Sequence, residues 1–224
     1  MVDDVATLQE AAEETWIGEF LEGPTRTRWS GLPIQAGDAA PDLSLPDTSG
    51  TQRRFSEWWQ EGPLHLVFLR HYGCGCLANR WEELQPALEK IGRAGAVTVA
   101  VSQAEPARSR PLAERRGYTF PVLSDPSRDA YAAYGLLDGV VATVFHDEQW
   151  APGDRAAADK LTASRRGSER ALVDHAWQLP GEFVIAQGGR IVLAHRAQHC
   201  EDFPPTGVLL GAIAAAQSQA GQDS

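Results

Sequence analysis

Cysteine is scarce in this chain, and its scarcity excludes one class of protein. The 224 residues include three cysteines, which are too few for the disulfide scaffold of a small secreted domain. Cysteines used so sparingly are typical of the reducing cytoplasm, which is the location we expect. Two of them that lie close together there more often have a redox or metal-binding role than a structural one.

Long apolar runs and an excess of positive charge are also missing. No segment approaches the roughly 20 apolar residues that a membrane-spanning helix needs. The N-terminal segment is acidic and has no apolar core, so we expect no signal peptide. Acidic residues outnumber basic ones by 30 to 20, and the net charge is −10. We therefore expect neither a membrane nor a nucleic acid as partner, because binding to phosphates depends on lysine and arginine.

The most informative stretch is residues 64–84, LHLVFLRHYGCGCLANRWEEL. The mostly apolar residues 64–70 predict a strand that is buried on both faces. A turn then leads into Cys74 and Cys76, and from about residue 77 the apolar spacing is helical. Because the N-terminus of a helix carries partial positive charge, it stabilises a thiolate. We interpret the pair as reactive thiols; the alternative is two small buried apolar side chains.

The rest of the chain predicts an α/β domain with additions. A helical leader and linker, 1–36, precedes a domain at 37–218 and a disordered tail at 219–224. The leader is expected to pack on the domain or on a second copy, which would make a homodimer. Residues 136–178 are too long for an ordinary connection, so we expect an insertion with its own helices or a lid. Short links between strands and helices predict a mostly parallel sheet covered on both faces, followed by an antiparallel hairpin.

Four segments carry a family resemblance. They are GDAAPDLSLPDTSG (37–50), LVFLRHYGCGC (66–76), FPVLSDPSRDAYAAYGL (120–136) and GEFVIAQGGRIVLAHRAQHCEDFPP (181–205). They resemble the entry hairpin, the cysteine turn, the strand and helix after the third strand, and the closing hairpin of the peroxiredoxin-like AhpC/TSA (redoxin) family. That resemblance implies a thioredoxin-like fold, with a central mixed sheet flanked by helices. It also implies an antioxidant thiol oxidoreductase that reduces peroxides or disulfides and is regenerated by an external thiol.

The sequence departs from the family pattern around the thiol. The family motif P-x-x-x-T-x-x-C, counted back from Cys74, finds Val67 and His71 in place of proline and threonine. The arginine of the motif L-R-G-x-F is replaced by Pro180, and Leu77 occupies the second cysteine position of C-x-x-C. A clamp for the peroxide would have to come from other cationic side chains. The candidates are Arg70, His71, Arg80 and Arg196.

Cys74 and Cys76 are the predicted catalytic pair, and the sequence leaves open which of them attacks. Cys76 lies nearer the helix start, whereas Cys74 matches the family's attacking cysteine. A disulfide between them would close a small ring with Gly75 supplying backbone freedom, which suits a catalytic role. Arg70 and His71 are the other predicted catalytic residues, because a nearby cation lowers the pKa of a thiol. The alternatives are a strand-end salt bridge for Arg70 and a solvent-facing turn position for His71.

Several residues have simpler interpretations. Cys200 is interpreted as a bystander rather than a resolving thiol, because the sequence does not show whether it reaches the cysteine turn. No cofactor is predicted. A zinc or copper site of Cys74, Cys76, His199 and Cys200 is an alternative that the spacing does not favour. The charged residues of 165–170 are interpreted as a solvated helix face.

Two functions from different classes follow. The first is a thiol oxidoreductase that uses the Cys-Gly-Cys pair. The second is a binding or scaffold protein with the same fold and a degenerate peroxidase site. The missing threonine and the proline in the arginine position motivate the second.

Overall fold

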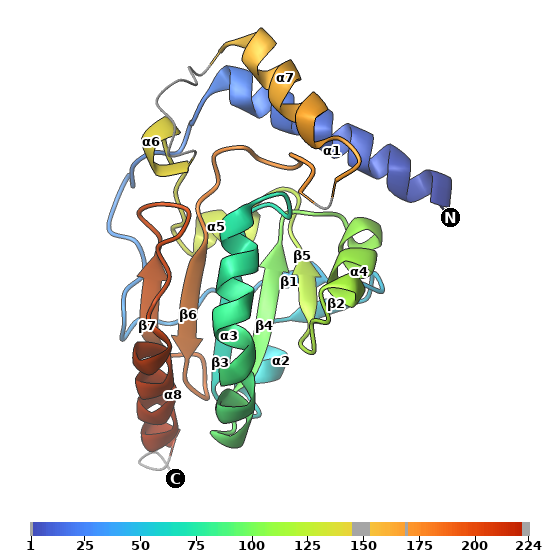
Figure 1. Ribbon diagram of the computed structural model, residues 1–224. Helices are drawn as coiled ribbons and strands as arrows, with labels where there is room; N and C mark the ends of the chain where they lie inside the picture. Colours follow the sequence, from blue (N-terminus) through green and yellow to red (C-terminus); the bar gives the residue numbers. More distant parts are fainter. Residues whose placement is uncertain (1, 145–152, 169, 221–224) are drawn as a thin grey trace.

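The fold is built around a five-stranded sheet. The computed structural model describes residues 2–144, 153–168 and 170–220. The strands of the sheet are β3 (Leu64–Phe68), β4 (Val97–Ser102), β5 (Val122–Ser124), β6 (Gly181–Ile185) and β7 (Ile191–Arg196). Their order is β5-β4-β3-β6-β7 (Figure 1). Strands β3, β4 and β5 are parallel, whereas β6 is antiparallel to both of its neighbours, β3 and β7. The predicted mixed sheet of a thioredoxin-like fold is therefore confirmed.

The other elements follow the predicted order. A short antiparallel hairpin consists of β1 (Ser44–Pro46) and β2 (Gln52–Arg54). The helices are α1 (Val2–Glu22), α2 (Ser56–Trp59), α3 (Gly75–Arg93), α4 (Pro106–Arg115), α5 (Asp129–Ala133), α6 (Val141–Val144), α7 (Arg155–Arg165) and α8 (Thr206–Ala220). Helix α8 is longer than predicted, so the expected tail boundary at 219 was wrong and falls inside the helix; residues 221–224 lie outside the described residues. Within the described ranges, no helix has the length and apolar character needed to cross a membrane.

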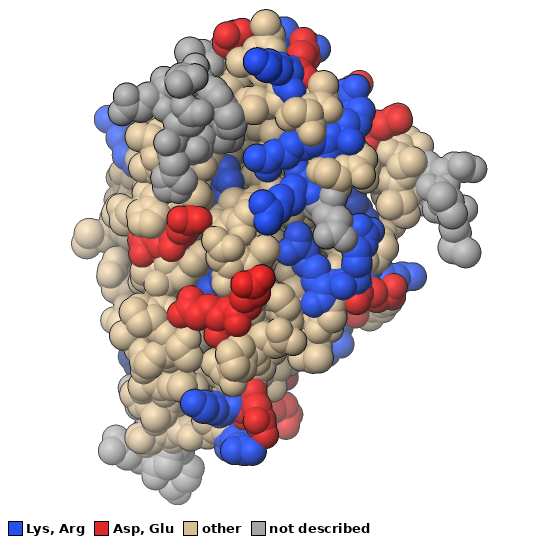
Figure 2. All heavy atoms as spheres, in the orientation of Figure 1, with Lys and Arg blue, Asp and Glu red and all other residues tan. Residues whose placement is uncertain are grey.

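The leader and the insertion meet at one end of the sheet. Helices α1 and α7 lie side by side beyond the carboxyl end of β3, at the top of Figure 1. Aromatic rings stack in series there, with centroids 5.1 Å apart between Trp16 and Phe20 and 5.7 Å apart between Phe20 and Trp177. Arginine and lysine side chains gather on the surface between α7 and α4 (Figure 2). The leader therefore packs on the insertion, directly above the cysteine turn.

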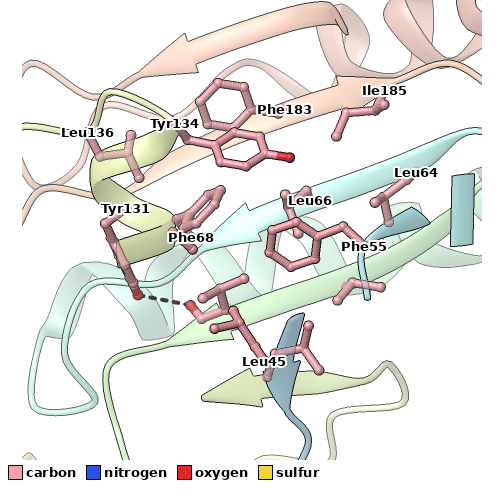
Figure 3. Packing of buried hydrophobic residues seen from close by; sticks show 14 of the residues in the cluster. Leu45, Phe55, Leu64, Leu66, Phe68, Tyr131, Tyr134, Leu136, Phe183 and Ile185 are labelled. Carbon is pink, nitrogen blue, oxygen red and sulfur yellow. Dashed lines mark hydrogen bonds between the residues drawn. The ribbon is translucent and has the colours of Figure 1, made fainter. Parts of the chain in front are cut away.

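Alternation along the strands divides the core between two layers. On one face, Leu66, Phe68 and Phe183 pack with Tyr131 and Tyr134 of the α5 region (Figure 3). The opposite face packs against α3 and α8. Alternate side chains of a strand point to opposite faces, so one buried strand supplies both layers. This double burial explains why β3 is apolar at every position except the buried His65.

The buried hydroxyl of Tyr131 ties the ends of two strands together. It donates to the carbonyl oxygens of Leu69, at 2.7 Å, and Val101, at 3.0 Å. Both carbonyls lie at the carboxyl ends of the central parallel strands, β3 and β4, and Leu69 immediately precedes the turn that carries the cysteines. The hydrogen bonds fix the place where that turn leaves the sheet.

Candidate active site

The cysteine pair lies at the start of a long helix. Cys74 is the N-cap of α3, with extended backbone angles (φ −75°, ψ 130°), and the helix runs for 19 residues from Gly75. The Cys74 N–H donates to the His71 carbonyl oxygen at 3.0 Å and closes the turn. The helix begins two residues earlier than predicted, so Cys76 is in its first turn. Both sulfurs therefore belong to the end of the helix where backbone N–H groups favour negative charge.

Cys74 and Cys76 are joined by a disulfide in this structure. Their Cα atoms are 5.4 Å apart, within the usual range for bonded cysteines. The backbone freedom expected of Gly75 is not used, since this residue is helical and is not among the positive-φ glycines. A Cβ added at Gly75 would instead lie 3.5 Å from the Arg170 guanidinium. That distance is an ordinary van der Waals contact, so a glycine is not needed at position 75 to make room for the arginine.

Gly73, in contrast, is required for a steric reason. A Cβ at this position would lie within 3 Å of two backbone atoms of Ala171, its carbonyl oxygen and carbon. Two backbone segments thus approach each other more closely here than any side chain permits. The turn that carries the cysteines is pressed against the segment that follows α7.

Arg70 is the cation that contacts the cysteine pair. Its Nη1 donates to Cys74 Sγ at 3.0 Å, and its Nη2 donates to the Ala176 carbonyl oxygen at 2.8 Å. The side chain is buried, and burial lowers the pKa of Arg70 to about 10. The guanidinium is therefore still protonated at neutral pH. A fixed, desolvated positive charge at this distance stabilises a Cys74 thiolate once the disulfide is reduced.

His71 lies in a different environment from the one its turn position suggested. It is 1% exposed, so the solvent-facing interpretation was wrong. Neither ring nitrogen has a hydrogen-bond partner among the residues that the structure describes. Burial, followed by the positive charges of Arg70 and Arg165, lowers the pKa of His71 well below its usual value. The ring is consequently neutral and supplies no cation to the thiols.

Cys200 lies beside the cysteine pair, a position that the sequence left open. Its sulfur and those of Cys74 and Cys76 all lie within 4.8 Å of one another. Cys200 is 4% exposed, and its N–H donates to the Thr143 carbonyl oxygen at 2.9 Å. Burial raises the pKa of the Cys200 thiol, and Arg70 opposes that rise. Cys200 therefore reaches the cysteine turn, whereas its role as a bystander stays a prediction.

The sheet topology explains how Cys200 reaches the pair. Strand β6 is antiparallel to β3, and β7 is antiparallel to β6, so β7 runs in the same direction as β3. The carboxyl ends of β3 and β7 thus meet at one edge of the sheet. Cys74 follows β3, and Cys200 follows β7. The order of the strands in the sheet would have predicted that Cys74 and Cys200 lie near each other, but that order cannot be read from the sequence.

The other two candidate arginines, Arg80 and Arg196, form hydrogen bonds with groups other than the cysteines. Arg80 forms a bidentate ion pair with buried Glu182, at 2.6 and 2.7 Å. Burial lowers the pKa of Arg80, but the ion pair with Glu182 outweighs this effect, so the pKa of Arg80 is raised. Arg196 donates to the carbonyl oxygens of Tyr134, at 2.9 Å, and Ile34. Of the four cationic candidates, Arg70 is the one for which the described residues show a hydrogen bond to a site sulfur.

A cavity of about 310 Å³ opens beside the sulfurs. Its lining includes all three cysteines, Arg165 and Arg170. Arg165 ends α7 and is half-buried, and Arg170 is exposed, so both are solvated as predicted, and they also line this cavity. Their placement depends on the packing of the insertion over the cysteine turn, for which the sequence offered no local signal.

The three sulfurs are also close enough to serve as metal ligands, although two of them are joined by the disulfide. The exposed His199 is not part of this set. The buried guanidinium of Arg70 points at Cys74 Sγ and would repel a cation bound there. The donor set therefore suits thiolate chemistry better than a metal centre.

Comparison with known proteins places this site in a family. The model of the AhpC/TSA family matches residues 36–194. The thiol-disulfide oxidoreductase ResA of Geobacillus thermodenitrificans is 32% identical over 118 residues, which are 50% of this chain and 63% of ResA. Peroxiredoxin-like 2C of Mus musculus is 23% identical over 190 residues, or 80% of each chain. The crystal structure of peroxidoxin BcpB from Mycobacterium tuberculosis has a TM-score of 0.56 at 19% identity, covering 83% of this chain and 97% of BcpB.

Proposed function

Since the chain belongs to the AhpC/TSA family of peroxiredoxin-like thiol oxidoreductases, we propose that Cys74 and Cys76 are its redox centre, with Cys74 as the nucleophile. The hydrogen bond from Arg70 Nη1 to Cys74 Sγ, at 3.0 Å, is the observation that carries this assignment. Cys74 is the N-cap residue and is 7% exposed, against 3% for Cys76. Charge stabilisation and access therefore favour the same sulfur.

With a peroxide as oxidant, the Cys74 thiolate attacks one oxygen and breaks the O–O bond. The products are a Cys74 sulfenic acid and an alcohol or water, which takes up a proton. The Cys76 thiol then displaces the hydroxyl as water and forms the Cys74–Cys76 disulfide. An external dithiol reduces that disulfide and is itself oxidised to a disulfide.

With a disulfide as oxidant, the Cys74 thiolate attacks one sulfur and releases the other as a thiol. The Cys76 thiol resolves the resulting mixed disulfide and releases the second half. The same internal disulfide forms in both reactions. Such an activity would serve antioxidant defence and redox homeostasis in the cytoplasm, where reducing thiols are abundant. A homodimer remains part of the proposal, to be tested by molecular mass in solution.

Arg70 supports this function because it replaces a missing family residue. The family's arginine precedes the closing hairpin, where this chain has Pro180. Here the cation comes from the end of β3, and its Nη1 donates to Cys74 Sγ. The scaffold alternative rested on the loss of that arginine, and no feature of the described residues favours it over thiol chemistry.

The test measures turnover and chemical trapping together. Hydrogen peroxide consumption and the reduction of a small disulfide are followed with dithiothreitol as reductant. The wild type is expected to turn over at least one oxidant, and Cys74→Ser to lose peroxide turnover and to reduce the disulfide more slowly than the wild type, through Cys76. Cys76→Ser is expected to retain a Cys74 sulfenic acid that dimedone traps. Equal turnover by wild type and Cys74→Ser would refute the proposal.

A further inference from the structure

The proposed function leaves one sulfur of the site unused. Cys200 is buried and is not part of the disulfide, and its sulfur lies within 4.8 Å of both bonded sulfurs. It comes from a different part of the chain, because the parallel directions of β3 and β7 bring their ends together. A thiol beside a disulfide is positioned for thiol–disulfide exchange.

We propose that Cys200 attacks Cys76 in the oxidised pair, a step that rests on the proposed function. The bond between Cys74 and Cys76 breaks, and a bond between Cys76 and Cys200 forms. Cys74 leaves as a thiolate, and the proton of the Cys200 thiol passes to solvent. The number of disulfides is unchanged, so the step needs no further oxidant or reductant.

Arg70 decides which sulfur leaves. Thiol–disulfide exchange is faster when the departing thiolate is the more stable one. The guanidinium donates to Cys74 Sγ at 3.0 Å, and Cys74 is the N-cap of α3. Attack on Cys76 therefore releases the sulfur that the site already stabilises as an anion. The consequence is a relay: the oxidation is held as Cys76–Cys200, and Cys74 is available for another substrate molecule.

The first experiment uses the disulfide probe 5,5′-dithiobis(2-nitrobenzoate), limiting in amount, on reduced Cys74→Ser. Cys76 attacks the probe and releases one thionitrobenzoate, and Cys200 then displaces the second. We expect two equivalents released per probe and no thionitrobenzoate retained by mass. The matched control Cys74→Ser/Cys200→Ser should release one and retain one. A stable adduct on Cys74→Ser, with Cys200 still open to alkylation, would overturn the relay.

The second experiment uses the wild type, so it does not depend on how the variants fold. The protein is equilibrated in a glutathione redox buffer, alkylated and digested with trypsin. The fragment 71–80 contains both members of the pair, and the fragment 197–224 contains Cys200. We expect these fragments to be joined through Cys76, with Cys74 alkylated. Finding solely the Cys74–Cys76 bond at every potential would refute the relay. Neither experiment measures turnover, so this result is separate from that of the proposed function.

A second, independent observation concerns charge at the cavity. Arg165 and Arg170 both line it, and Arg165 Nη1 approaches the Gly73 carbonyl oxygen at 3.5 Å. Their neighbour Arg166 pairs with Glu13, but within the described ranges neither lining arginine forms an ion pair. Two guanidinium groups that show no ion pair with a described carboxylate therefore stand beside the sulfurs, in a chain whose net charge is −10.

From this we infer that the cavity binds oxidants that carry a carboxylate, an inference that also rests on the proposed function. A guanidinium binds a carboxylate through two parallel hydrogen bonds, which orients the ligand as well as holding it. Glu201 also lines the cavity, and its Oε1 accepts a hydrogen bond from Asn79 Nδ2 at 3.5 Å. The carboxylate of Glu201 would repel an anion, so the arginine side of the cavity is the side that receives it.

The test compares two disulfide probes on the reduced protein. One is 5,5′-dithiobis(2-nitrobenzoate), which carries two carboxylates, and the other is neutral 2,2′-dithiodipyridine. Arg165→Gln/Arg170→Gln should slow the reaction with the anionic probe about tenfold and leave the neutral probe unchanged. Arg166→Gln, which removes a neighbouring charge, should change neither rate. An equal loss for both probes, or no loss, would refute carboxylate selection. The neutral probe's rate on the wild type reports the thiol chemistry separately.

Discussion

The hydrogen bond from Arg70 to Cys74 makes a quantitative prediction. Arg70→Met removes the guanidinium and keeps most of the apolar volume. A hydrogen bond to a charged group contributes about 1.5–3 kcal/mol, and each pKa unit corresponds to about 1.4 kcal/mol. We therefore expect the pKa of the reduced Cys74 thiol to rise by about 1 to 2 units. The higher pKa reduces the fraction of Cys74 present as thiolate at neutral pH, but a more basic thiolate is also a better nucleophile. The rate of reaction of Cys74 at neutral pH should therefore fall by about three- to tenfold, which is less than the fall in the thiolate fraction.

The assay must isolate one thiol. In the background Cys76→Ser/Cys200→Ser, Cys74 is the sole cysteine. Its rate of alkylation by iodoacetamide, measured against pH, gives the pKa directly. The matched control is Arg196→Met, which removes a half-buried arginine that also donates to a backbone carbonyl oxygen. This control should leave the Cys74 pKa unchanged.

The result that would refute the reasoning is an unchanged Cys74 pKa in Arg70→Met, with a native circular dichroism spectrum. It would mean that the helix N-terminus alone stabilises the thiolate and that Arg70 has a purely structural role through Ala176. An equal shift in the Arg196→Met control would point to a general change in fold stability. The two outcomes are separated by measuring the unfolding free energy of both variants.

Three further predictions concern stability and the shape of the site. Tyr131→Phe removes the hydroxyl that donates to the buried Leu69 carbonyl oxygen, whereas the Val101 carbonyl oxygen still accepts from the Leu69 N–H, so urea unfolding should show a loss of about 1–3 kcal/mol. His71 is neutral when folded because burial lowers its pKa well below 6.5, whereas the unfolded chain takes up a proton as pH falls below 6.5. The unfolding free energy should thus decrease by up to about 1.4 kcal/mol per pH unit below pH 6.5. His71→Leu should reduce this pH dependence, and an identical slope in the variant would contradict a neutral His71 in the folded protein. Gly73→Ala places a Cβ against the backbone of Ala171, so we expect a lower melting temperature and loss of peroxide turnover. Native values for both would show that the backbones of residues 73 and 171 do not approach each other closely.

The sequence by itself determined the order of elements and the place of the cysteine pair. Both are local properties. The apolar run of β3 predicts a strand buried on two faces, and the change to helical spacing marks the start of α3 within two residues. A helix N-terminus stabilises a thiolate wherever it occurs, so the chemistry of Cys74 and Cys76 could be predicted without the rest of the fold. Arg70 was a candidate for the same reason, being four residues from Cys74.

The tertiary structure alone decided what surrounds that pair. It brought Cys200 to the sulfurs, because β7 runs parallel to β3 and ends at the same edge of the sheet. It paired Arg80 with Glu182 on β6 and placed Arg165 beside the sulfurs by packing the insertion over the turn. These outcomes depend on contacts between residues far apart in the chain, and no local pattern records such contacts. The sequence therefore predicted the thiols, whereas the third sulfur and the charge of the cavity came from strand order and packing.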